Sequence, residues 1–135
     1  MEVQVLKVHA YQALIDVASQ SDNVEEIKVT ISKAMETVRE LSVGLKLSFG
    51  RSALQVGMRQ IELDVCADAI ATFRLILQVL DAVLSNTAAW RAFCAEGAVV
   101  DSDDGKATRA VSEHYVYVMK IKTQLAMVFS FTQMK

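Results

Sequence analysis

The stretch VCADAIATFRLILQVLDAVL, residues 65–84, is the most apolar window of the chain and decides its fold. Successive residues of a helix are rotated by about 100°, and on this basis its apolar side chains cover roughly half of the helix circumference. The apolar stripe of an ordinary surface helix is only about 100° wide. The polar strip that remains consists of Arg74, Gln78 and Asp81. This helix is therefore either the central one of a bundle, touched on two sides, or the one that carries an oligomer interface.

Composition predicts one domain with more apolar surface than a single chain can bury. The chain has 135 residues, of which 53% are apolar, and its mean hydropathy is +0.28. A small domain has a large surface for its volume, and a second protein chain is the commonest cover for surplus apolar area. We therefore expect a single helical-bundle domain over 1–135 that forms a homo-oligomer, with a dimer favoured, and binds a protein partner.

Charge and cysteine content exclude several other classes. The 14 basic and 16 acidic residues give a net charge of −2, which provides no general reason to bind nucleic acid. Asp68, Arg74 and Asp81 would be costly in lipid, so we expect no transmembrane segment. Cys66 and Cys94 are predicted to be buried free thiols, and the N-terminus does not resemble a signal peptide. Both features suit a cytoplasmic or other intracellular location.

Helices are the only regular structure that the sequence pattern predicts. Proline is absent, glycine occurs five times, and apolar residues recur at spacings of three and four. We expect long helices over 3–19, 24–48, 52–85 and 106–132, and a short one within SNTAAWRAFCAEG, 85–97. Long helices with short connections predict an all-α fold, an antiparallel bundle of four long helices plus one short helix.

Two of the connections carry helix-boundary signals. Asn23, or Asp22 beside it, can cap the start of the second helix. In SFGRS, Gly50 can end that helix in the left-handed conformation and Ser52 can cap the next. A helix that continues through Gly50 is the alternative that the sequence leaves open.

The most polar stretch is DSDDGK, residues 101–106, which invites comparison with a calcium loop. An EF-hand loop needs glycine at position 6 and a bidentate glutamate at position 12. Counted from Asp101, these positions hold Lys106 and Ser112. We therefore interpret the stretch as the loop before the last helix and expect no metal.

Catalytic residues are not evident in the sequence. A nucleophile needs a base within hydrogen-bond reach, and neither of the two histidines lies in such a motif. Phosphate-binding glycine motifs are absent, and Asp64 with Asp68, one helical turn apart, is most simply a solvated edge. We expect no enzyme, no cofactor site and no metal site.

The last helix has an apolar seam with the spacing of a packed bundle helix. It consists of Val111, His114, Val118, Ile121, Leu125 and Val128. His114 is expected to be a hydrogen-bonded core or interface residue on this seam. A sharper hypothesis makes His114 a pH-sensitive seam residue, because protonation would place a charge on a packed surface.

The function predicted from these features is a non-enzymatic protein–protein interaction module of adaptor, scaffold, chaperone or effector type. It would self-associate and dock a partner through apolar helix faces, by burial of apolar area. Phe129 and Phe131 do not share a helical face, so at least one should point away from the core. The predicted contact residues are Phe73, Ile76, Leu80, Trp90, Phe129 and Phe131.

An alternative function uses the same apolar surplus in a different way. The bundle would carry a lipid or another apolar small molecule between its helices. Trp90 and Met127 would then line the cavity.

Overall fold

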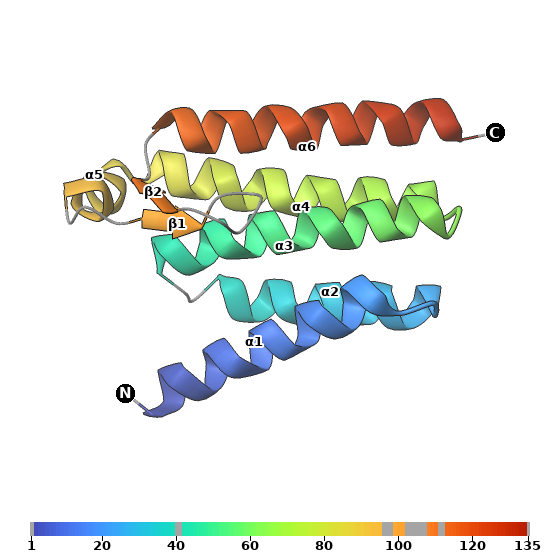
Figure 1. Ribbon diagram of the computed structural model, residues 1–135, viewed down its shortest axis with the longest axis horizontal. Coiled ribbons are helices and arrows are strands. Elements are labelled where there is room, and N and C mark those ends of the chain that lie inside the picture. Colours follow the sequence, from blue (N-terminus) through green and yellow to red (C-terminus); the bar gives the residue numbers. More distant parts are fainter. Residues whose placement is uncertain (1, 40–41, 96–98, 102–107, 111–112, 135) are drawn as a thin grey trace.

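The computed structural model describes residues 2–39, 42–95, 99–101, 108–110 and 113–134, with side chains described over 9–10, 12–39, 42–93 and 115–134. Along the chain the elements are α1 (Glu2–Gln20), α2 (Val24–Val38), α3 (Val43–Glu62), α4 (Cys66–Ser85), α5 (Thr87–Ala95), β1 (Val99–Asp101), β2 (Thr108–Ala110) and α6 (Glu113–Gln133). Figure 1 shows the long helices running lengthwise, with α1 and α2 at one side, α3 and α4 in the middle and α6 at the opposite side.

The expected helical bundle is confirmed, but the predicted helix count is wrong. The described part of the chain contains five long helices and one short one, because two of the four predicted long helices are each divided. The 24–48 helix is interrupted between α2 and α3, and the 52–85 helix between α3 and α4. In addition, β1 and β2 form a short antiparallel ladder where a loop and the start of the last helix were expected.

The break between α2 and α3 is made by a serine cap instead of by a glycine. Ser42 has extended backbone angles, and its side-chain oxygen accepts a hydrogen bond from the Leu45 N–H at 3.5 Å. Such a side chain satisfies one of the amides that the first helical turn leaves unpaired. The new helix then continues through Gly50, so the alternative that the sequence left open is confirmed. Gly50 instead allows close packing, since a Cβ there would lie 3.0 Å from Met119 Sδ of α6.

The break between α3 and α4 is a tight turn built on Asp64, whose φ is 61°. The Asp64 N–H donates to the Ile61 carbonyl and the Val65 N–H to the Gln60 carbonyl, each at 3.0 Å. This pair of bonds is the Schellman motif, in which the left-handed position is usually occupied by glycine. Aspartate tolerates that conformation better than most residues, which explains how a turn without glycine divides the predicted helix.

The left-handed conformation of Asp64 predicts that Asp64→Gly stabilises the protein. Glycine adopts this conformation without steric cost, and we expect the free energy of unfolding to rise by about 0.5–1 kcal/mol. Asp64→Ala, which removes the same carboxylate but keeps a Cβ, should instead lower it. Urea unfolding of the two variants and the parent protein measures the difference, and equal stability of both variants would contradict this account.

The central helix of the bundle is α4, as one of the two interpretations of residues 65–84 predicted. It packs against α3 on one side and α6 on the other, with further contacts to α5 and α2. Its buried residues are Cys66, Ala69, Ile70, Thr72, Phe73, Ile76, Val79, Leu80 and Val83. Thr72 is the polar member, and its hydroxyl donates to the buried Gln60 Oε1 of α3 at 2.5 Å. Both middle helices therefore contribute a polar group to the core, and the two groups bind each other.

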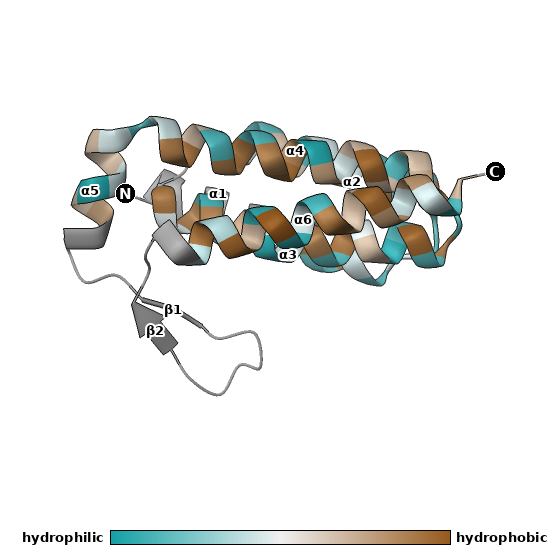
Figure 2. Cartoon of the chain, turned by 90° about the horizontal axis from the view of Figure 1, so that it is seen from above, coloured by the Kyte–Doolittle hydropathy of each residue, from teal (hydrophilic) through white to brown (hydrophobic). Residues whose placement is uncertain are grey.

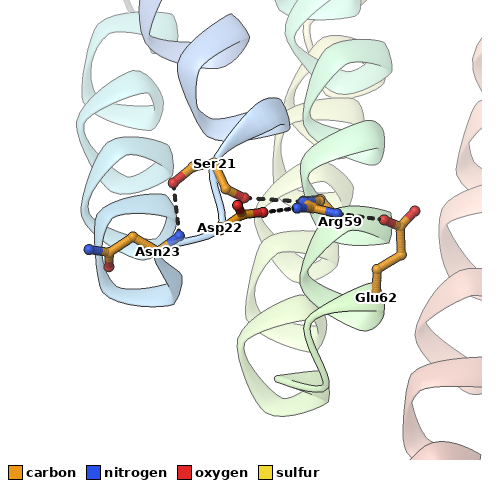
Figure 3. A network of polar contacts seen from close by, with 5 residues as sticks. All are labelled: Ser21, Asp22, Asn23, Arg59 and Glu62. Carbon is orange, nitrogen blue, oxygen red and sulfur yellow. Dashed lines mark hydrogen bonds and ion pairs between the residues drawn. The ribbon is translucent and has the colours of Figure 1, made fainter.

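A polar network centred on Arg59 ties the α1–α2 connection to α3 (Figure 3). Arg59 donates to the Ser21 carbonyl at 3.1 Å and to Glu62 at 2.9 Å, and it also binds the Asp22 carboxylate. The hydrogen bond to Glu62, with further contributions from Asp22, raises the pKa of Arg59 above its usual value. Next to this network, Asn23 caps α2 by accepting the Glu26 N–H at 3.1 Å, which confirms one of the two predicted caps.

Candidate functional site

One face of α6 packs against the bundle, and it includes a threonine and a serine. Tyr115, Val116 and Met119 are buried on this face, together with Thr123 and Ser130. The Thr123 hydroxyl donates to the Met119 carbonyl at 2.8 Å, and the Ser130 hydroxyl to the Ala126 carbonyl at 2.9 Å. Because each hydroxyl is satisfied within its own helix, both can be buried at little cost.

The predicted seam of the last helix lies on the opposite face, so the expectation that it packs within the bundle is wrong for its described residues. Ile121, Leu125 and Val128 are exposed, and Val118 is half-buried. The side chains of Val111 and His114 lie outside the described residues, and so does the proposed packing of His114. The helix is apolar nearly all round, so its periodicity could not determine which side faces the core.

The exposed side of α6 carries most of the large apolar side chains that the described part of the chain leaves in solvent. We call it the outer face, and it consists of Tyr117, Ile121, Leu125, Val128, Phe129 and Phe131. These six residues are 47–64% exposed, and they are six of the ten large apolar side chains exposed among the described residues. Figure 2, which views the bundle from the α6 side, shows apolar segments recurring along this helix.

The solvent side of α2 shows how the other helices differ. Its exposed positions are Glu25, Glu26, Lys28, Val29, Ser32, Lys33 and Glu36, a mostly charged set with one apolar member. Such a polar side is what a helix on the surface of a soluble protein normally presents. The outer face of α6 is therefore an exception that calls for an explanation.

Charged groups are confined to the first half of α6. Lys120 forms an ion pair with Asp81 of α4 at 3.0 Å, and Lys122 is exposed. From 123 to 134 the sequence has no charged residue. From 123 onward the outer face thus has no charged neighbour on its own helix, which lowers the cost of covering it with another apolar surface.

The structure separates the six predicted contact residues into two groups. Phe73, Ile76 and Leu80 are 0% exposed and Trp90 is 4% exposed, and all four lie in the core of this chain. A partner cannot reach them in this arrangement. Phe129 and Phe131 belong to the outer face, where both are about half exposed. The exposed seam residues Ile121, Leu125 and Val128 are the part of the surface that sequence reasoning placed inside the bundle.

The other positions considered for chemistry do not form a site in the described part of the chain. Asp64 and Asp68 border a surface hollow of about 310 Å³ together with Gln133 and Met134. Within the described residues, no group of three or more histidine, cysteine or carboxylate side chains is arranged to hold a metal ion. Cys66 is a buried free thiol, as predicted, whereas the side chain of Cys94 and most of DSDDGK lie outside the described part of the chain.

Trp90 and Met127 were expected to line an apolar ligand cavity, but neither borders the groove between α3 and α6. Trp90 is packed in the core, where it stacks on Phe93 with ring centroids 6.1 Å apart, and Met127 is half-buried. A groove of about 420 Å³ between α3 and α6 is bordered by polar residues such as Arg51 and Gln55, as well as by Val118 and Met119. Neither predicted lining residue borders this groove.

Comparison of the chain with protein-family models, with curated protein sequences and with solved structures finds no significant match. Across the described ranges, each helix lacks the uninterrupted apolar length that crossing a bilayer requires.

Proposed function

We propose that this protein is a non-enzymatic protein–protein interaction module that docks a protein partner through the outer face of α6. The observation that carries the proposal is the cluster of six large apolar side chains, each about half exposed, on the side of α6 that faces away from the bundle. Covering them would release apolar area from contact with water, at about 25 cal/mol per Å² before the costs of ordering.

The composition of the outer face supports docking more than it supports a purely structural role. Aromatic residues are enriched at the centres of protein interfaces, and Tyr117, Phe129 and Phe131 bring three of them to this face. A scaffold, adaptor, chaperone or effector would each use such a surface. The buried free thiol of Cys66 suits the reducing, intracellular compartment that we include in the proposal.

The proposal predicts that a charge on the outer face abolishes partner binding without unfolding the chain. Ile121→Lys places an ammonium group in the middle of the apolar face, where covering it by a partner would cost several kcal/mol. The matched control is Val29→Lys, which makes the same change at a similarly exposed position on α2. Affinity capture with quantitative mass spectrometry is followed by reconstitution of the complex from purified components.

A stoichiometric complex with another protein or with a second copy would support the proposal. The Ile121→Lys variant should not form this complex, whereas the Val29→Lys variant should still form it. Circular dichroism should show equal helix content in both variants. A complex that survives Ile121→Lys, or a reconstituted complex that both variants lose equally, would overturn the assignment of the outer face.

A further inference from the structure

We infer that the outer face of α6 binds the same face of a second copy, with the two α6 helices antiparallel. This inference rests on the proposed function, and it identifies the docking partner as a second copy of the chain. Three properties of the face lead to it: the spacing of its residues, the distribution of its charges and the area that it offers.

The residue spacing on the outer face is that of a helix packed lengthwise against another helix. Ile121, Leu125 and Val128 of the outer face follow one another in steps of four and three residues. Half-buried Val118 and exposed Thr132 continue this spacing at either end. Alternation of three and four keeps a stripe on one side of a helix over several turns, as in coiled coils. The occupant that matches this stripe is another helix of similar length. A second α6 carries the same stripe, and such a symmetric pairing is the commonest way in which proteins form dimers.

The charge distribution selects the antiparallel orientation. In a parallel pair, helix ends of equal sign would meet, whereas an antiparallel pair brings ends of opposite sign together. In an antiparallel pair centred between Leu125 and Val128, the uncharged segments 123–130 of the two copies lie against each other. Each Lys122 then lies near the last turn of the other α6, where the carbonyl ends carry partial negative charge.

The exposed area suits a dimer of moderate affinity. Six large side chains at about half exposure offer on the order of 500 Å² per copy, so the pair would bury about 1,000 Å². That total is at the lower limit for a specific interface. We expect a reversible dimer with a Kd on the order of 1–10 μM.

Sedimentation equilibrium tests whether the dimer exists and which face forms it. The average mass should rise from 14.9 kDa towards twice that value as the protein concentration rises from about 1 to about 200 μM. Leu125→Glu, at the most exposed of the six positions, should raise the Kd at least about 30-fold. Val29→Glu on α2 is the matched control and should leave the Kd unchanged.

Photocrosslinking tests the orientation. A photoreactive benzoylphenylalanine replaces Ile121, and the protein is mixed with an isotope-labelled copy so that intermolecular peptides are recognised. The antiparallel arrangement places Ile121 opposite Thr132 of the second copy, so crosslinks should fall within 129–134. Crosslinks within 118–124 would indicate a parallel pair and overturn the inference.

The two proposals fail in different ways. A native protein that stays at 14.9 kDa at every concentration overturns the dimer, and so does a dimer that Leu125→Glu leaves intact. If the native protein is monomeric but binds a different protein through Ile121, the docking function stands and the second copy is excluded as its partner. If neither kind of complex forms, both proposals are wrong.

Discussion

Gly57→Ala is expected to destabilise the protein by about 2 kcal/mol or more, although alanine is the better helix former by about 1 kcal/mol. Gly57 lies buried within α3, and a Cβ there would be 2.2 Å from Cε1 of Phe73. The Phe73 ring is 0% exposed, so it has no solvent-filled space into which it can move. The added methyl group must therefore push α3 and α4 apart or force Phe73 out of its rotamer.

Gly50→Ala is the matched control for this prediction. It makes the same change in the same helix, two turns earlier, and the closest atom is the sulfur of Met119 at 3.0 Å. A methionine side chain can adjust by a few tenths of an ångström, so the gain in helix propensity should offset the crowding. We expect a change within about 0.5 kcal/mol, measured by urea unfolding of both variants. Equal effects of the two substitutions would contradict the assigned packing of Gly57 on Phe73.

Phe73→Ala is expected to lower the free energy of unfolding by about 3–5 kcal/mol, because it removes a fully buried aromatic ring and leaves a cavity between α3 and α4. Its matched control is Phe129→Ala on the outer face, where about half of the side chain is already in solvent. For a monomeric chain this control should cost less than about 1 kcal/mol. Unfolding is measured at a protein concentration well below the expected Kd, so that association does not contribute.

The double variant Gly57→Ala/Phe73→Ala distinguishes this packing from a general loss of stability. Without the ring, the methyl group at position 57 meets no clash and fills part of the cavity. Gly57→Ala should therefore be neutral or stabilising in the Phe73→Ala background. Additive effects of the two changes would show that the residues do not oppose each other.

The helical class and the central helix could be predicted from the sequence because both depend on hydrophobic periodicity over many residues. Residues 65–84 are apolar around half of a helix, and α4 occupies 66–85 at the centre of the bundle. The predicted helix boundaries were wrong because each boundary depends on a single residue with an uncommon role. Asp64 occupies a position that usually holds glycine, and Gly50 serves close packing instead of a helix end.

The candidate site was only partly within reach of sequence reasoning. Phe129 and Phe131 were selected because they do not share a helical face, and both are exposed, at opposite edges of the broad outer face. Phe73 was selected because it belongs to the apolar surplus of the predicted 52–85 helix, and such residues are equally typical of a core. The seam of the last helix was assigned to the wrong side because the helix is apolar nearly all round, so its periodicity does not identify the buried side. That side includes the polar residues Thr123 and Ser130. Their bonds to their own helix, which cancel that polarity, depend on side-chain geometry.

The position of α6 has a consequence for the order of folding. The pairs α1–α2 and α3–α4 are each joined by only a few residues, so they can form by local contacts that close rapidly. In contrast, α6 reaches α4 only after the intervening chain from 86 to 112 has been closed into a loop, which is a slower search. During synthesis α6 also emerges after the five other helices, and until it docks both of its apolar sides are exposed to solvent. We expect aggregation to compete with folding mainly in the interval before α6 docks.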